Sequence, residues 1–221
     1  MSKMKNLIIA LLLFTTSCSS KNNWECTEGD CENGEGTRSW KDNGLEKGHW
    51  INGELNGKGY QFFGTTSNFS GDTYTGNFKD DEYSGFGTYY DKSEDSKYVG
   101  NWKNGKPDGK GIGKWGENSK YPGRYYDGEY KNGLMHGHGT KFWGIAEEDK
   151  FTNNKYVGEW KHDEMDGFGK YEWADGSYYE GPWKNGNQNG YGIYVFKNGE
   201  VFKGYWDDGY CEALSKKMGL E

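Results

Sequence analysis

The chain has 221 residues and a net charge of −7 at pH 7, with no cluster of Lys and Arg beyond its first residues, so we expect no nucleic-acid partner. Its 37 Gly and 3 Pro exclude collagen-like and polyproline proteins. The mean hydropathy is only −1.11, but the 10 Trp, 18 Tyr and 11 Phe side chains can each bury about 150–250 Å², which is enough for an aromatic core.

Residues 1–17 are predicted to form a secretory signal peptide. Two lysines precede an apolar run at residues 7–14, which is too short to span a bilayer, and small residues lead to Cys18. The string FTTSCSS resembles a bacterial lipoprotein signal, which implies that Cys18 is lipidated and becomes the mature N-terminus. The alternative is ordinary signal cleavage with Cys18 incidental. Ser19 stands where Asp would retain such a lipoprotein at the inner membrane, so the resemblance favours the outer membrane.

Residues 18–45 are predicted to be a lipidated N-terminus followed by a cap that contains a disulfide. Export would place the cysteines in an oxidising compartment, and Cys26 and Cys31 are separated by only four residues, so we expect them to pair. Cys211 would then remain, either buried at the C-terminal end or available for an intermolecular link. A Cys-x₄-Cys metal site lacks the further ligands that zinc needs.

A glycine and aromatic pattern recurs from residue 46 onwards. With Gly100 as position zero in YVGNWKNGKPDGKGIGKW, aromatic residues stand two before and two after, and glycines stand five, nine and eleven after. We call the glycine at position zero of each unit its start glycine. The aromatic residues two positions after the start glycines are predicted to form the core: Trp50, Phe78, Trp102, Tyr130, Trp160, Trp183 and Trp206. Typical repeat glycines are Gly100, Gly109, Gly111, Gly128, Gly137 and Gly139. The string GIGKWG, which matches a dinucleotide-binding motif, is therefore explained by the repeat.

Each unit is predicted to be a β-hairpin. The first strand alternates with period two, an Asn-Gly type turn follows, and Gly-x-Gly opens the second strand. We expect Trp102 opposite Gly109 and Gly100 opposite Gly111, with the glycines forming sockets for the rings of the next unit. Another aromatic residue recurs fifteen positions after the start glycine and is expected in the same core, while Lys, Asp and Asn cover the other face. These residues are Phe63, Trp115, Trp143, Trp173 and Phe196.

The pattern closely resembles the MORN (membrane occupation and recognition nexus) repeat over residues 46–210, with six full units and a truncated seventh. The resemblance implies an all-β fold, an elongated single-layer antiparallel sheet of stacked β-hairpin repeats with short N- and C-terminal caps. Residues 211–221 would form the C-terminal cap as a short helix. The family implies an assembly scaffold and does not imply catalysis.

The function that we expect is therefore a non-catalytic, membrane-anchored protein-interaction scaffold in the cell envelope. The alternative is a glycan or cell-wall binding module. We expect membrane attachment through the N-terminal lipid, an unidentified protein partner, weak homodimerisation, and no cofactor. His136 and His138 share a face of a predicted strand, but no further His is near them in sequence, so no metal site is predicted.

Overall fold

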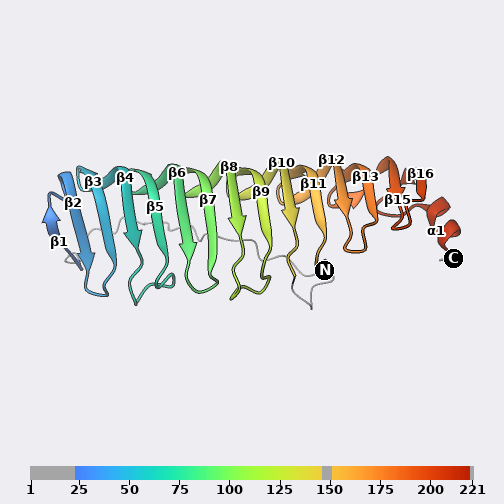
Figure 1. The fold of residues 1–221 in the computed structure, drawn as a ribbon. Helices are drawn as coiled ribbons and strands as arrows, with labels where there is room; N and C mark the ends of the chain where they lie inside the picture. The colour runs from blue at the N-terminus through green and yellow to red at the C-terminus, as the bar shows by residue number, and fades with distance from the viewer. Residues whose placement is uncertain (1–22, 146–150, 220–221) are drawn as a thin grey trace. The chain divides into compact units, whose positions relative to one another are not determined.

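The computed structural model describes residues 23–145 and 151–219, which contain sixteen strands and one helix (Figure 1). The predicted signal peptide and Cys18 lie outside the described residues. The chain divides into two compact units, Met1–Ser119 and Lys120–Glu221. Each unit is an open antiparallel sheet in which neighbouring strands follow one another along the chain, so the predicted all-β hairpin fold is confirmed.

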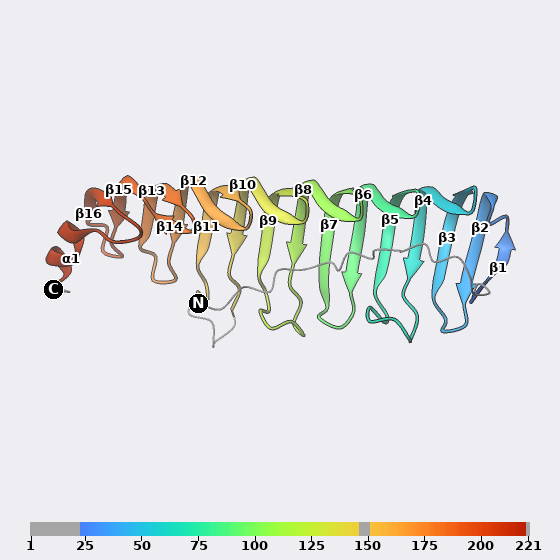
Figure 2. The same ribbon diagram turned by 180° about the vertical axis from the view of Figure 1, so that it is seen from behind.

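The first unit carries eight of the described strands, and Figure 2 shows them from behind in the same order. The strands are β1 (Trp24–Gly29), β2 (Asn33–Trp40), β3 (Leu45–Ile51), β4 (Glu54–Phe62), β5 (Thr73–Lys79), β6 (Glu82–Asp91), β7 (Ser96–Lys103) and β8 (Lys106–Lys114). The first hairpin, β1–β2, precedes the repeats and pairs with β3, so it extends the sheet at its N-terminal edge.

The second unit carries the remaining described strands and the helix. These elements are β9 (Tyr125–Lys131), β10 (Leu134–Phe142), β11 (Lys155–Lys161), β12 (Glu164–Glu172), β13 (Tyr178–Lys184), β14 (Asn187–Gln188), β15 (Gly190–Val195), β16 (Val201–Trp206) and α1 (Glu212–Met218). The two-residue strand β14 pairs with β13, while β15 continues the sheet from β13 to β16. Helix α1 ends at Gly219, which adopts the left-handed conformation that favours glycine at a helix C-terminus.

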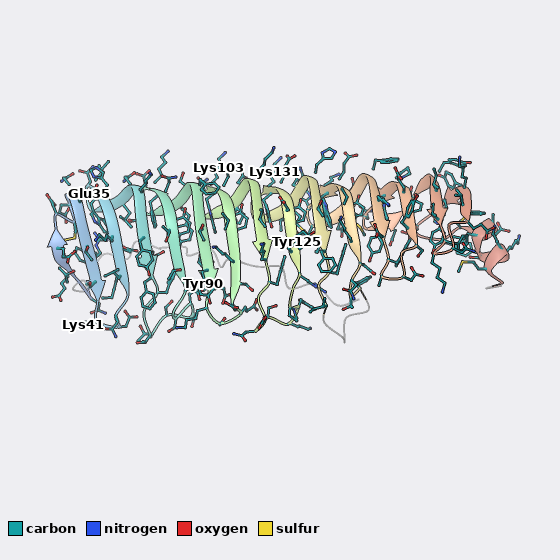
Figure 3. All side chains as sticks on the ribbon, viewed as in Figure 1. Glu35, Lys41, Tyr90, Lys103, Tyr125 and Lys131 are labelled. Carbon is teal, nitrogen blue, oxygen red and sulfur yellow. A yellow bond between two sulfur atoms is a disulfide. The ribbon has the colours of Figure 1, made fainter. Side chains whose placement is uncertain are left out.

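Two-residue turns close the hairpins of the six full repeat units, as the sequence predicts. Both turn residues have positive φ, for example 50° at Asn104 and 70° at Gly105, which is the type I′ geometry that matches the twist of paired strands. Figure 3 labels Lys103 at the turn end of β7 and Tyr90 near the loop end of β6. In the second unit, Lys131 lies at the turn end of β9 and Tyr125 at its loop end.

Asp81 and Asp163 occupy the second turn position where the other units have glycine. Their φ angles are 63° and 70°, a region that Asp tolerates better than most residues. Each carboxylate also accepts a hydrogen bond from the backbone of the preceding hairpin, over 2.7 Å from Leu55 N–H to Asp81 and 2.8 Å from Met135 N–H to Asp163. The side chain therefore supplies a contact between hairpins that glycine cannot make.

The predicted pairing inside the hairpin is partly wrong. Gly100 does face Gly111, but Trp102 faces Pro107 and not Gly109, because the register shifts between Gly100 and Trp102. Gly109 has φ = 102°, so the chain bulges there and the extra residues lie opposite Asn101. The expected pairing instead occurs between successive hairpins, where Trp102 faces the bulge glycine Gly85 of the preceding unit.

Candidate interaction surface

The inner face of each sheet, which we define as the face that carries the buried aromatic residues, has tyrosines lying over pairs of glycines. A Cβ atom on Gly111 would overlap the hydroxyl of Tyr98, and one on Gly100 would lie 2.6 Å from it. The same arrangement occurs at Tyr74, Tyr126, Tyr156 and Tyr179. The ring in each socket thus belongs to the same unit and not to the next, because residues two apart on a strand share a face.

We call the tyrosine that lies over each glycine pair a socket tyrosine. Its hydroxyl also donates a hydrogen bond to a backbone carbonyl that the bulge leaves without a strand partner. The Tyr98 hydroxyl donates to the Asn101 carbonyl over 3.0 Å, and the Tyr156 hydroxyl donates to the Glu159 carbonyl over 3.1 Å. These carbonyls lie opposite the bulge, where a regular ladder partner is missing. Burial raises the pKa of both tyrosines, which keeps the hydroxyl protonated as a donor.

The predicted core aromatics, at the second position after each start glycine, are all buried. They are Trp50, Phe78, Trp102, Tyr130, Trp160, Trp183 and Trp206, none more than 9% exposed. Four of the tryptophans donate their indole N–H to a glycine carbonyl of the preceding hairpin, as Trp183 does to Gly169 over 3.1 Å. Trp183 also meets Tyr156 of that hairpin edge to face, with 5.4 Å between ring centres. These rings bind neighbouring hairpins together and are not available to a ligand.

The aromatic residues fifteen positions after the start glycines contribute less to the core than we expected. Only Trp143 is buried, at 7% exposed, and it packs against Tyr171 with ring centres 5.3 Å apart. Phe63, Trp115, Trp173 and Phe196 are partly exposed. They follow the end of the second strand, where the chain leaves the sheet for a loop.

A buried polar position that the sequence did not reveal lies four residues before the start glycine. Its residues are Asp72, Ser96, Arg124, Asn154 and Ser177, all under 9% exposed. The Asn154 Oδ1 atom accepts the Ala174 N–H over 2.9 Å, and the Ser96 hydroxyl accepts the Gly116 N–H over 3.0 Å. Because four different residue types fill this position, which holds the loops in place, no repeating sequence signal marks it.

The first repeat unit has a polar cluster in place of a socket tyrosine. Glu46 accepts a hydrogen bond from the Gln61 amide over 2.8 Å, and the Tyr83 hydroxyl donates to Gln61 over 2.5 Å. Arg38, opposite Glu46 on β2, lies 4.0 Å from the ring centres of Trp24 and Trp50.

Burial raises the pKa of Glu46 to about 7, and the nearby Asp81 carboxyl acts in the same direction. The Arg38 charge opposes this shift.

The outer face, opposite the inner face, exposes large side chains that we did not expect there. In the second unit, Phe168, Tyr191 and Tyr205 are 55%, 65% and 65% exposed. Phe168 faces Pro182 across β12 and β13, and Tyr191 faces Tyr205 across β15 and β16. We call these four residues the outer row.

The outer row is continuous across four strands. A Cβ atom on Gly190 would lie 3.1 Å from Pro182, which connects the Phe168–Pro182 pair to the neighbouring strand β15. Three of its residues, Phe168 on β12, Tyr191 on β15 and Tyr205 on β16, carry exposed rings on one face, and Pro182 on β13 lies between the first two. Exposed aromatic side chains in a row on one face are typical of a surface that binds a partner.

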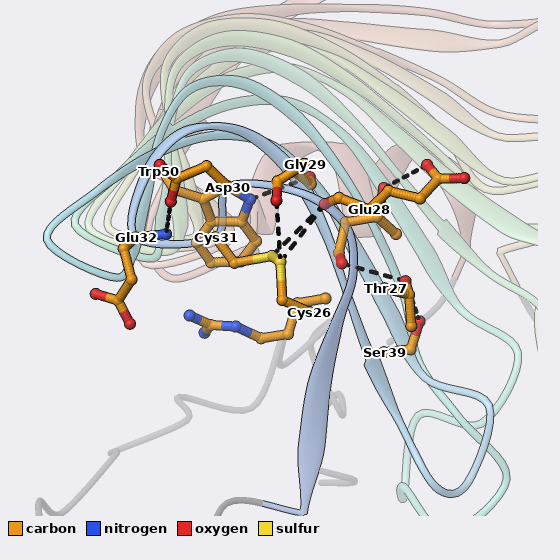
Figure 4. The surroundings of a disulfide bond; sticks show 12 residues. Cys26, Thr27, Glu28, Gly29, Asp30, Cys31, Glu32, Ser39 and Trp50 are labelled. Carbon is orange, nitrogen blue, oxygen red and sulfur yellow. Dashed lines mark hydrogen bonds between the residues drawn. A yellow bond between two sulfur atoms is a disulfide. The ribbon is translucent and has the colours of Figure 1, made fainter.

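The N-terminal cap contains a disulfide between Cys26 and Cys31, with Cα atoms 5.9 Å apart (Figure 4). Cys31 is 4% exposed, and a Cβ atom on Gly36 would lie 3.0 Å from its sulfur. Cys211 is a free cysteine and is also buried, at 6% exposed. Within residues 23–145 and 151–219, no helix combines the length and hydropathy that crossing a membrane requires.

A family model for the MORN repeat matches more than half of the chain, at residues 47–64, 74–96, 98–117, 126–144, 156–178 and 179–201. MORN repeat-containing protein 3 of Xenopus laevis is 36% identical over 81 residues, which are 35% of this chain and 33% of that protein. The chain thus spans about a third of the length of this relative.

Two solved structures of Drosophila melanogaster Sas-4 show a weaker likeness. One is the TCP domain in complex with a proline-rich motif of Ana2, with a TM-score of 0.43 and 14% identity over 79% of this chain and 85% of that one. The other is the TCP10c domain, with a TM-score of 0.40 and 15% identity over 79% and 93%. At these scores the likeness carries no inference about function.

Proposed function

Because the chain belongs to the MORN repeat family, we propose that it is a non-catalytic scaffold that binds another protein through the outer row. The observation that supports this proposal is the exposure of Phe168, Tyr191 and Tyr205. The repeat aromatics on the inner face are buried between hairpins and cannot contact a partner. Exposed Tyr and Phe side chains supply large contact areas at low entropic cost and are enriched where proteins bind one another.

A lipid on Cys18 would hold this scaffold in the cell envelope, at the outer membrane. The support is the sequence of residues 1–18, in which lysines, an apolar run and small residues lead to the cysteine. Metabolic labelling with palmitate tests it. We expect label in the wild type and none in Cys18→Ala, and equal incorporation in both would rule out lipid at Cys18.

Binding of a glycan is the second candidate, and the same outer row is the observation that favours it. Neighbouring strands lie about 4.8 Å apart, so the Tyr191 and Tyr205 rings lie side by side, and the Pro182 ring separates them from Phe168 on the same face. Tyrosines on such a platform offer ring faces to the C–H groups of sugar rings and hydroxyls to their oxygens.

One variant tests whether the outer row binds a partner. We would replace Phe168, Tyr191 and Tyr205 with Ser together, and compare Phe86→Ser, which removes an exposed ring at the equivalent repeat position of the first unit. Cross-linking of intact envelopes should recover a partner set with wild type and Phe86→Ser and lose it with the triple variant. An unchanged partner set in the triple variant would refute the proposed surface, and saturable binding of purified peptidoglycan lost in that variant would favour the glycan candidate.

A further inference from the structure

Two histidines that are far apart in the sequence meet at the turn end of adjacent hairpins in the second unit. His136 lies on β10, and His162 is the first residue of the β11–β12 turn, 26 positions later. Their ring centres are 5.5 Å apart and the ring planes are tilted by 50°, so the rings are in contact but do not stack face to face. The structure brings together a pair that sequence spacing did not suggest.

The backbone fixes this approach. Asp163, next to His162, donates its N–H to the Met135 carbonyl over 3.0 Å and accepts the Met135 N–H at its carboxylate over 2.8 Å. Met135 directly precedes His136, so the two hydrogen bonds hold the residues that carry the two rings side by side. A ligand that joins the rings would therefore find the backbone already ordered.

Two polar atoms at this junction are buried without a hydrogen-bond partner among the described residues. They are Nδ1 of His136 and Oδ2 of Asp163, and buried orphan atoms of this kind point to a water or an ion bound in place. Both belong to side-chain types that bind divalent metals.

We propose that His136 and His162 form a site for a divalent transition-metal ion of the Zn²⁺, Ni²⁺ and Cu²⁺ class. A metal–nitrogen bond of about 2.0–2.1 Å places each ring centre about 3.2 Å from the ion, so two imidazoles in tetrahedral coordination have centres about 5 Å apart. The observed 5.5 Å fits this geometry after small side-chain rotations. Imidazole nitrogen selects these metals over Mg²⁺ and Ca²⁺, which prefer oxygen ligands.

The ion would keep water at its remaining positions. Among the described residues, no three His, Cys, Asp or Glu side chains are arranged to hold a metal ion together. The Asp163 Oδ2 atom is buried and has no hydrogen-bond partner among the described residues, so it could accept a hydrogen bond from such a water. The bound ion would join two successive hairpins at their turns, and its exchangeable waters would leave it open to a further ligand.

The test uses the full chain and Zn²⁺ alone, by titration calorimetry at pH 7.5 and by thermal melts with and without the metal. The key variant is His162→Asn, because Asn occupies the same turn position at residues 52, 104, 132 and 185, so this change preserves the turn. His136→Gln removes the other ring. His138→Gln removes the neighbouring imidazole on β10, and His49→Gln is the control from the first unit.

We expect one Zn²⁺ per wild-type chain. His162→Asn and His136→Gln should reduce the affinity for Zn²⁺ at least about tenfold, because even replacing a residue that only hydrogen-bonds to a metal ligand has an effect of this size. Zn²⁺ should raise the melting temperature of wild type and His49→Gln but not of His162→Asn. Absence of saturable binding in wild type, undiminished binding in His162→Asn, or an equal loss in His138→Gln would overturn the assignment.

Discussion

Each tyrosine over a glycine pair stabilises its hairpin in two ways. Its ring packs on the two glycines, and its hydroxyl donates a hydrogen bond to the carbonyl opposite the bulge. Tyr156→Phe keeps the ring and removes only the hydrogen bond to the Glu159 carbonyl. Because a partly buried carbonyl is left without this partner, we expect the free energy of unfolding to fall by about 1–2 kcal/mol. Tyr205→Phe, at 65% exposed, is the matched control and should change stability little. Urea unfolding measures both, and equal effects would contradict the role of the hydroxyl.

Glu46 replaces that tyrosine in the first unit and makes stability depend on pH. Its carboxyl loses its proton near pH 4.5 in the unfolded chain but only near pH 7 in the folded protein. The folded state therefore binds more protons between these values, and stability falls as pH rises from about 4.5 to 7, then stays level.

Gln cannot ionise, so Glu46→Gln should match wild type at pH 4 and be more stable above pH 7, by up to about 3 kcal/mol. Denaturant unfolding across this pH range measures the difference between the two proteins. Glu82→Gln, an exposed residue next to a turn, should follow the wild-type curve throughout. A constant offset between Glu46→Gln and wild type at every pH would contradict the assignment.

Hairpins tolerate change in their loops but not at their bulges. Two residues inserted beside the exposed Asn118 lengthen a loop, and each doubling of a loop costs only about 0.6 kcal/mol. One residue inserted between Gly109 and Gly111 moves Gly111 out of register with Gly100 and turns the rest of β8 over. Thermal melts should show a small shift for the first variant and loss of a cooperative transition for the second. Similar shifts in both would argue against a register set by the glycines.

How much of a hairpin the sequence could predict depends on how regularly its residues recur. The turns and the Gly100–Gly111 pairing follow from residues that recur in most units, and both occur in the structure. The bulge was missed because Gly109 reads like any strand glycine until its φ is known. Asn154 belongs to a position that Asp, Ser, Arg or Asn fills in different units, so its role leaves no pattern. The pairing of His136 with His162 needed the register between two hairpins, which loops of variable length hide from sequence spacing.

The C-terminal end of the second unit is the place where a second copy would associate. Among the described strands, β16 pairs only with β15, so its other edge has no strand partner, and Val201 and Tyr205 on this strand are more than half exposed. Cys211 is buried beside Gly204, with its sulfur 3.1 Å from where a Cβ atom on that glycine would lie, so an intermolecular disulfide does not suit the folded chain.

We therefore expect a weak, non-covalent dimer through the edge of β16. Sedimentation at high micromolar concentration of the unlipidated Cys18→Ser chain should show the same dimer fraction with and without reducing agent. Val201→Lys combined with Tyr205→Lys should abolish the dimer, because charges on an exposed edge oppose strand addition while both sites remain in water. Phe86→Lys adds a charge to an exposed site of the first unit and should leave association unchanged. A dimer that disappears under reducing conditions, or persists in the double Lys variant, would place the contact elsewhere.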